Sequence, residues 1–277
     1  MSDKGRELFD LTGRVAVITG SGANGGLGHA MALGLARFGA DIVSSDIDEP
    51  GAKVTAEEVR ALGRRSIAVR CDVSQEAEIA RLFAEVDKEF GRVDILVNNA
   101  FRGLRAYPED VSLEDWNKVM TVSLTAYFLC AQQAGRRMIR QGRGGSIINI
   151  SSIAGCLALG RGNFVYSVAK GGVNQFTREL AVEWAHYGIR VNAIVPAQTL
   201  TPSFRKLLDD PQFDSKALLS RLLSGIPLNR LGEPEDFVGP VVFLASDASA
   251  FVTGVLLPVD GGNLALNAGG SHTWPRA

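Results

Sequence analysis

The stretch Val15-Ala-Val-Ile-Thr19, followed at once by Gly20-Ser-Gly-Ala-Asn-Gly-Gly-Leu-Gly28, decides the fold of this chain. An uncharged apolar run of this length is typical of a strand that is buried on both faces. A helical pattern over Gly26–Phe38 follows the glycines. Such a turn lets the backbone approach a pyrophosphate, and the helix N-terminus presents free N–H groups to it. A glycine-rich hairpin tip is the alternative, but the flanking strand and helix favour a nucleotide site.

Short apolar runs alternate with helical patterns along the whole chain, which indicates an α/β fold. Runs that are apolar throughout predict a parallel sheet, and regular alternation predicts a doubly wound sheet with helices on both faces. No linker, charge block or repeat divides residues 1–277, so we expect a single domain. The expected strands, about seven, are Val15–Thr19, Asp41–Ser45, Ser66–Arg70, Val93–Val97, Ser146–Ile150, Arg190–Val195 and Gly254–Val259. The expected helices are Gly26–Phe38, Ala52–Leu62, Glu76–Phe90, Leu113–Gln141 and Ala169–His186.

Two segments interrupt this alternation. Residues 197–226 follow the sixth strand and contain a helical pattern over Lys216–Leu223. Because ligands bind beyond the carboxyl ends of parallel strands, we expect this insertion to form a lid. The tail, residues 263–277, is rich in Gly and Asn. A terminus is disordered by default, but Leu264, Leu266 and Trp274 favour packing on a neighbouring subunit.

Composition excludes several classes of function. A formal net charge of -1 provides no field that would attract nucleic acid or an anionic membrane. The N-terminus resembles no signal peptide, and no run of 18 apolar residues is present, so we expect a cytoplasmic protein. Cys71, Cys130 and Cys156 are too few and too far apart for a zinc site or a disulfide framework. We therefore expect no metal and three buried thiols.

Asp46 directly follows the second expected strand, where an acidic group would meet the adenosine ribose of a dinucleotide. A carboxylate there accepts hydrogen bonds from the ribose hydroxyls and repels a 2′-phosphate. The glycine turn contains no Lys or Arg. The sequence therefore predicts NAD rather than NADP, although Asp46 could simply begin a turn.

Tyr166 and Lys170 lie four residues apart and follow the pair Ser151-Ser152. This spacing places both side chains on one face of a helix. A phenol can pass a proton to a carbonyl oxygen, an ammonium group lowers the pKa of that phenol, and a hydroxyl can position the substrate. Together with the glycine turn, these residues predict an active site for hydride transfer.

In this order, the motifs of the chain resemble the short-chain dehydrogenase/reductase family. The resemblance extends over roughly Leu11–Gly262 and is specific, because several independent motifs occur in the family's order. Besides the glycine turn, these are Cys71-Asp72-Val73, Asn98-Asn99-Ala100, Asn149-Ile-Ser-Ser152, Tyr166-x-x-x-Lys170, Arg190-Val-Asn-Ala-Ile-Val-Pro196 and Val259-Asp-Gly-Gly262.

The resemblance implies a Rossmann-type fold and reversible oxidation of a secondary alcohol to a ketone. It implies that Tyr166 is the general acid/base, that Lys170 lowers its pKa and holds the nicotinamide ribose, and that Ser152 orients the substrate. The implied cofactor-binding residues are Gly20, Ser21, Gly22, Asn24, Gly26, Leu27, Gly28, Asp46, Asp72, Val73, Asn98, Ala100, Tyr166, Lys170, Pro196 and Thr199.

The chain departs from the family pattern at several positions. The family's glycine spacing fits from Ser21-Gly22 onward, so we expect the junction between strand and turn to be lengthened. Phe101 and Ala197 replace glycines. Ser123 replaces an asparagine whose backbone is thought to hold a water molecule in the proton relay to lysine, which puts that relay in doubt.

Four arginines belong to loops expected at the carboxyl edge of the sheet, namely Arg102, Arg105, Arg161 and Arg205. If two or more converge, they would suit an anionic substrate such as a sugar acid or aldonate. Scattered solvated arginines are the alternative. We take Ser152, Arg102 and Arg161 as the candidate substrate contacts.

Other functions remain open at this point. A 3-oxoacyl thioester reductase has a similar sequence, although Asp46 argues against the NADPH that such enzymes generally use. A dinucleotide-binding regulator that catalyses no reaction is a second alternative, but it would have no reason to keep Ser152, Tyr166 and Lys170 together. A lyase or epimerase on the same scaffold is a third. The resemblance also implies a homotetramer or homodimer formed through Leu113–Gln141 and Ala169–His186.

Overall fold

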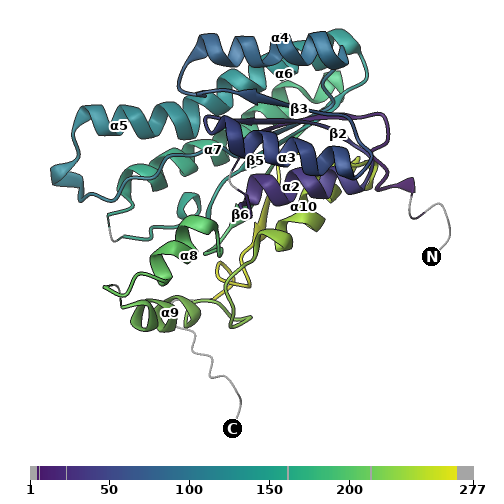
Figure 1. Cartoon of the computed structure of the whole chain (residues 1–277). Helices are drawn as coiled ribbons and strands as arrows, with labels where there is room; N and C mark the ends of the chain where they lie inside the picture. The colour runs from purple at the N-terminus through teal and green to yellow at the C-terminus, as the bar shows by residue number, and fades with distance from the viewer. Residues whose placement is uncertain (1–4, 6, 23, 161, 213, 267–277) are drawn as a thin grey trace.

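The computed structural model describes residues 5, 7–22, 24–160, 162–212 and 214–266. Seven strands of the described chain form one parallel sheet in the order β3-β2-β1-β4-β5-β6-β7 (Figure 1). Neighbouring strands pair in parallel throughout the sheet. The strand order reverses between β1 and β4, which creates a crevice at their carboxyl ends. The strands are β1 (Val15–Thr19), β2 (Asp41–Asp46), β3 (Ser66–Arg70), β4 (Ile95–Asn98), β5 (Gly145–Ile150), β6 (Ile189–Pro196) and β7 (Leu256–Val259).

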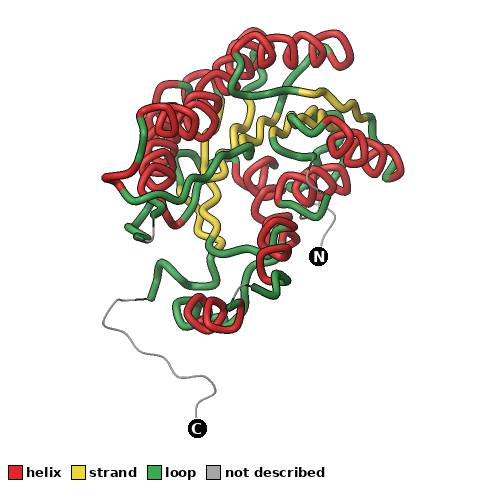
Figure 2. Tube along the Cα trace, turned by 60° about the vertical axis from the view of Figure 1, so that its left-hand side comes forward, coloured by secondary structure: helices red, strands yellow, loops and turns green. Residues whose placement is uncertain are grey.

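Helices cover both faces of the sheet, which confirms the predicted doubly wound architecture (Figures 1 and 2). One face carries α4, α6 and α7, and the other carries α2, α3 and α10. The helices are α2 (Leu27–Arg37), α3 (Glu49–Ala61), α4 (Glu76–Phe90), α5 (Leu113–Met120), α6 (Ala126–Gln141), α7 (Phe164–Glu183), α8 (Pro202–Leu208), α9 (Ser215–Leu223) and α10 (Val238–Ala245).

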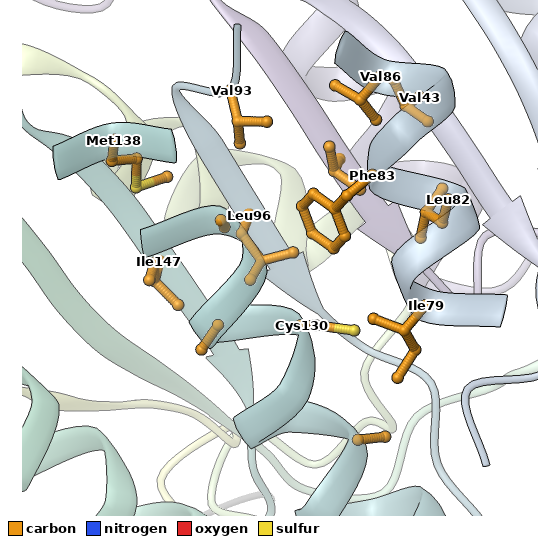
Figure 3. Close-up of a cluster of buried hydrophobic side chains, with 14 of the residues drawn as sticks. Val43, Ile79, Leu82, Phe83, Val86, Val93, Leu96, Cys130, Met138 and Ile147 are labelled. Carbon is orange, nitrogen blue, oxygen red and sulfur yellow. The ribbon is translucent and has the colours of Figure 1, made fainter. Parts of the chain in front are cut away.

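The apolar strands contribute alternate residues to two separate cores. Val15 and Val17 of β1 belong to the cluster under α4 and α6, whereas Ile18 packs with Met31 and other residues of α2. Figure 3 shows the first cluster, in which Phe83 of α4 lies among strand and helix side chains. This double burial explains why the strands lack polar alternation.

Two predicted helices differ from the structure in ways that matter for the site. The expected helix Leu113–Gln141 is interrupted by a π-helical turn, η2 (Thr121–Thr125), between α5 and α6. The helix expected from Ala169 begins instead at Phe164, so Tyr166 and Lys170 both lie within α7. The apolar periodicity did not distinguish a π turn from continuous helix, because both keep the chain helical.

The predicted lid contains two short helices, α8 and α9, that pack around a small apolar cluster of their own. Its buried members are Leu218, Leu222, Ile226 and Leu231. At the start of the predicted tail, the Asn263 side-chain amide donates to the Gly225 carbonyl at 2.6 Å. Residues 267–277, including Trp274, lie outside the described residues.

The cysteines show one difference from expectation. Cys71 and Cys130 are buried as predicted, but Cys156 is exposed because it follows the short 3-10 turn η3 (Ile153–Gly155) at the edge of the sheet. Within the described ranges, no group of three or more His, Cys, Asp or Glu residues is arranged to hold a metal ion. In the same ranges, no helix combines the length and apolar sequence needed to cross a bilayer.

Candidate active site

A cavity of ≈ 840 Å³ opens at the carboxyl edge of the sheet, beside the point where the strand order reverses. Its size falls within the range of cofactor and substrate sites. Most of the predicted site residues meet here, although they come from distant parts of the sequence. The predicted residues that line the cavity are Gly20, Gly26, Leu27, Gly28, Asp46, Asp72, Val73, Ala100, Arg102, Ser152, Tyr166, Lys170, Pro196 and Thr199.

The glycine turn packs too closely for side chains. A Cβ at Gly20, whose φ is +70°, would lie 2.7 Å from the Cα of Ala100. A Cβ at Gly28 would collide with the Gly20 carbonyl oxygen. The turn ends at Gly26, the N-cap of α2, where no side chain caps the helix and no acidic residue occupies the first turn. Uncapped N–H groups and the helix dipole at the cavity suit a phosphate group.

Asn99 fixes this turn from the next strand. Its side-chain amide donates to the carbonyl oxygens of Gly20 at 2.7 Å and Thr19 at 3.1 Å. The Thr19 hydroxyl accepts from the Asn99 and Ala100 backbone N–H groups at 3.1 and 3.3 Å. The role of Asn99 in the turn was not predicted from the motif Asn98-Asn99-Ala100, and its polar side chain directly after a buried strand was the available signal.

Four predicted cofactor residues do not line the cavity. Asn98 is fully buried, and its amide donates to Asn149 Oδ1 at 3.0 Å, because its side chain points into the interior of the sheet. The Ser21 hydroxyl is buried against Ser44 Oγ, 2.9 Å away. Gly22 is buried, and Asn24 is exposed outside the lining.

The glycine spacing was also assigned to the wrong glycine. In the structure Gly20, not Gly22, packs on Gly28 at the cavity wall. Gly22 instead packs on Asp46, and its backbone N–H donates to Asp46 Oδ2 at 2.8 Å. Because Gly20 follows β1 directly, the additional length lies in the turn between Gly20 and Gly26 rather than at the predicted junction between strand and turn.

Asp46 ends β2 and faces the cavity. Its Oδ1 accepts from the Asp48 backbone N–H at 2.9 Å, and its Oδ2 accepts from Gly22. Two backbone donors hold the carboxylate in one orientation. Because an ionised carboxylate offers about four acceptor positions, it can still accept from ribose hydroxyls.

Tyr166 and Lys170 reach the cavity from the first turns of α7, and Ser152 reaches it from the end of β5. Ser152 Oγ accepts from the Ala154 backbone N–H at 3.1 Å. The neighbouring Ser151 hydroxyl is bound to Asn174 Oδ1 at 2.5 Å. Of the two hydroxyls, that of Ser151 is therefore held by a buried amide, whereas Ser152 lies beside Tyr166 in the cavity lining.

Burial governs the electrostatics of this corner. Desolvation lowers the pKa of Lys170 to about 7. Desolvation also raises the pKa of Tyr166, and the neighbouring Ser152 hydroxyl acts in the opposite direction. Charged forms are therefore costly here, so the tyrosine can act as a base at neutral pH only while the lysine remains an ammonium.

The predicted arginines do not converge in the part of the chain that the structure describes. Arg102 lines the cavity and makes no ion pair with any described residue. Arg105 is exposed and lies outside the lining, and Arg205 is paired with Glu233. Arg161 lies outside the described residues. A single described arginine, rather than a cluster, stands beside the reacting groups.

Phe101 forms a cavity wall that the sequence analysis did not assign to the site. Its ring makes an edge-on contact with Tyr166, with the ring centroids 6.0 Å apart. The residue is 62% exposed, so its ring forms an apolar surface of the cavity beside Tyr166. The departure from glycine at this position was the signal that could have identified it.

Comparison with known proteins agrees with this geometry. A family profile described as enoyl-(acyl carrier protein) reductase matches residues 20–263. The 2-dehydro-3-deoxy-D-gluconate 5-dehydrogenase of Escherichia coli (strain K12) is 43% identical over 93% of this chain and 98% of its own. The chain belongs to the short-chain dehydrogenase/reductase family. It is thus a nicotinamide-dependent oxidoreductase that acts on CH–OH groups.

Two further members of the family are similar over most of their length. The D-threitol dehydrogenase of Mycolicibacterium smegmatis is 37% identical and covers 92% of this chain and 94% of its own. A crystal structure of a gluconate 5-dehydrogenase from Burkholderia cenocepacia, in complex with NADP and tartrate, has a TM-score of 0.86 and 36% identity. It covers 95% of this chain and all of its own.

As a short-chain dehydrogenase/reductase, the protein requires a dinucleotide, and the residues present fit one. The uncapped N-terminus of α2 and the close-packed glycines suit the pyrophosphate. Asp46 and Asp72 lie at the carboxyl ends of the paired strands β2 and β3, and Tyr166 and Lys170 lie on α7; all four line the cavity. The residues expected at the two ends of the cofactor therefore line a single cavity.

Proposed function

We propose that this enzyme oxidises a secondary hydroxyl group of a sugar acid or related hydroxy acid to a ketone, reversibly and with NAD as the preferred cofactor. The proposed substrate class rests on the position of Arg102. It is a cation without an ionic partner among the described residues, and it lines the cavity that also contains Ser152 and Tyr166. A guanidinium group pairs in bidentate fashion with a carboxylate, which would orient the hydroxyl toward the tyrosine.

The proton chemistry is assigned to this chain's own residues. Ser152 donates a hydrogen bond that positions the substrate oxygen, and Tyr166 removes the hydroxyl proton during oxidation. Lys170, as an ammonium, stabilises the resulting phenolate and binds the nicotinamide ribose. The bound nicotinamide supplies the hydride acceptor. In the reverse direction Tyr166 returns the proton to the carbonyl oxygen.

The preference for NAD rests on Asp46. Its carboxylate is held at the end of β2 by the N–H groups of Gly22 and Asp48, where it would repel a 2′-phosphate. The Burkholderia relative is in complex with NADP, and the ratio of kcat/KM for NAD to that for NADP measures the preference of this chain.

The substrate class has support from the relatives. The Escherichia coli and Burkholderia proteins are named for gluconate-type sugar acids, and the Burkholderia crystal also contains tartrate, a hydroxy dicarboxylate. The Mycolicibacterium relative is named for a neutral polyol. Arg102 is the feature that favours the acids.

The deciding experiment is a substrate survey with NAD and with NADP, followed through the absorbance of the reduced nicotinamide. The panel contains D-gluconate and related sugar acids, D-threitol as a neutral polyol, and acetoacetyl-CoA assayed as a 3-oxoacyl thioester in the reducing direction. We expect oxidation of an acid with NAD. In Arg102→Gln, KM for that acid should rise about 10-fold or more, since a lost charged hydrogen bond costs ~1.5–3 kcal/mol.

Arg105→Gln is the matched control, because Arg105 lies on the same loop but outside the cavity. Its KM should equal that of the wild type. A clear preference for the polyol or the thioester, or equal effects of the two arginine substitutions, would contradict the proposed substrate class.

We also infer that the enzyme is a homotetramer or homodimer. Large apolar side chains are exposed on the helices expected to form the interface, including Phe128 on α6 and Val182 on α7, which is 77% exposed. Sedimentation equilibrium of the purified protein tests the inference, and a monomer at micromolar concentration would contradict it.

A further inference from the structure

Lys170 is bound by a side chain that the proposed chemistry does not use. Its Nζ donates to Tyr127 Oη at 3.1 Å and to the Ile150 carbonyl oxygen at 2.6 Å. The lysine is 1% exposed, so water does not replace these acceptors. An ammonium group has three N–H donors. Two of them are therefore satisfied from within the protein, and the third is free to face the cavity.

The hydrogen bonds of Tyr127 have a fixed direction. Tyr127 Oη donates to the Ile150 carbonyl at 3.1 Å, so its lone pairs remain for Lys170. Burial raises the pKa of Tyr127 well above its ordinary value, so it stays a neutral phenol. The Lys170 Nζ also lies 4.9 Å from the centroid of the Tyr127 ring, a distance suited to a cation–π contact.

The backbone around Tyr127 is shaped to hold this position. The π turn η2 ends two residues before Tyr127, and the fully buried Ser123 lies within it. The Ser123 hydroxyl accepts from the Arg102 N–H at 2.9 Å and donates to the Arg102 carbonyl at 3.0 Å. The Asn98 side-chain amide lies 3.3 Å from the Tyr127 carbonyl. Both anchors connect the start of α6 to the segment that begins at the end of β4.

We propose that Tyr127 is a positioning residue that supplies an acceptor to the Lys170 ammonium and so keeps the lysine charged beside Tyr166. This inference rests on the proposed function, because it concerns the lysine that activates the proposed base. A purely structural role is the alternative, in which the ring fills the core and the hydroxyl serves only Ile150.

The surroundings explain why a neutral acceptor would matter here. Among the described residues, Lys170 makes no ion pair with a carboxylate. The titratable groups that influence Tyr127 are Tyr166 on α7 and Cys130 on α6, and burial raises the pKa of both. Without a nearby anion, dipoles such as those of Tyr127 and Ile150 are what offset the desolvation of the ammonium.

The test is Tyr127→Phe, which keeps the ring and removes the hydroxyl. Tyr187→Phe, at the opposite end of the sheet before β6, is the matched control. In the holoenzyme with NAD, the acid limb of the pH profile of kcat/KM should move about one unit to higher pH in Tyr127→Phe. The reason is that a less charged Lys170 stabilises the Tyr166 phenolate less. Tyr187→Phe should reproduce the wild-type profile.

A second readout does not depend on any substrate. Protein labelled with ¹³C at lysine Cε is titrated by NMR, and the Lys170 signal is assigned by its loss in Lys170→Met. The Lys170 midpoint should fall by about one unit in Tyr127→Phe. This measurement separates the two claims, since a wild type that is inactive on the whole panel refutes the proposed function while the Lys170 titration still decides the role of Tyr127.

An unchanged Lys170 midpoint and an unchanged pH profile in folded Tyr127→Phe would overturn the proposal and leave Tyr127 as a core residue. If Tyr127→Phe does not fold, Tyr127→Gln provides the comparison, because its amide oxygen keeps an acceptor without the ring. A midpoint within a few tenths of a unit of wild type then supports the acceptor role, and a fall of one unit overturns it.

Discussion

The glycine turn and the lid border the same cavity but are stabilised in different ways. The turn is held by backbone hydrogen bonds to the sheet, including Gly20 N–H to the Ser45 carbonyl at 2.8 Å, and by the Asn99 amide. The lid packs mainly on its own apolar cluster around Leu218 and Leu222. The turn is therefore built into the main fold, whereas the lid is a separate, smaller packing unit.

This difference bears on how one scaffold can accept different substrates. The cofactor is common to the family, and backbone atoms that contact it do not change with side-chain replacement. Lid residues such as Thr201, Pro202 and Ser203 line the cavity with side chains on short helical segments, and these can vary without disturbing the sheet. We therefore expect substitutions at the turn to affect binding and stability together, and substitutions in the lid to affect mainly the substrate.

The largest effect is expected from Gly28→Ala. The new methyl group would collide with the Gly20 carbonyl oxygen, so the neighbouring backbone would have to shift. Such overpacking lowers the free energy of unfolding by ~1–3 kcal/mol. We expect NADH affinity to fall about 10- to 100-fold, with a lower free energy of unfolding. Fluorescence titration and urea denaturation measure the two quantities.

Gly239→Ala is the control for this substitution. Gly239 lies in α10, where a Cβ would meet no atom within 4 Å. Alanine in a helix is favoured over glycine by ~0.5–1 kcal/mol, so this variant should equal or exceed the wild type in stability. If Gly28→Ala binds NADH as tightly as Gly239→Ala does, the turn is less rigid than its packing indicates.

The glycine turn was predictable from the sequence in its location but not in its detail, because Ser21, Gly22 and Asn24 do not line the cavity. Its function is carried by backbone atoms, and glycines between a buried strand and a helix are visible in one dimension. The position of Tyr166 and Lys170 on one helical face was predictable for the same reason, because helical spacing is local. The doubly wound parallel sheet was predictable from the alternation of strands and helices together with the rules for connecting parallel strands, whereas the order of its strands was not predicted.

The parts that were missed depend on contacts between distant segments. Asn98 and Asn99 follow one another, yet one points into the interior and the other into the turn, and only the register of β4 decides which. Tyr127 lies in an apolar run and looks like an ordinary core residue. Its hydroxyl reaches Lys170 after a π turn that no apolar pattern reveals.

A smaller effect, confined to the cofactor side, is expected from Asp46→Asn. The amide oxygen can replace the carboxylate as an acceptor for Gly22, but the charge that would repel a 2′-phosphate is removed. The ratio of kcat/KM for NAD to that for NADP should fall about 10-fold, which corresponds to ~1.4 kcal/mol. Asp48→Asn, two residues away and exposed, should leave the ratio unchanged. Equal ratios in the wild type and Asp46→Asn would remove Asp46 from the ribose site.

The smallest effect on catalysis, and the sharpest test of the comparison, is expected from Leu222→Ala. Leu222 is 9% exposed and belongs to the lid cluster. Leu244 is a residue of α10 and is fully buried in the main core between that helix and the sheet. Burial of a leucine in a main core is worth ~2–5 kcal/mol, so Leu244→Ala should lower Tm by about 5–15 °C.

Leu222→Ala should lower Tm by less than about 3 °C, because a separate packing unit can loosen without unfolding the sheet. It should raise KM for the sugar acid a few-fold and leave NADH affinity as in the wild type. Differential scanning calorimetry and steady-state kinetics on both leucine variants measure these effects. If Leu222→Ala lowers Tm as much as Leu244→Ala does, the lid unfolds with the sheet, and substrate variation in this scaffold has to be explained by cavity side chains alone.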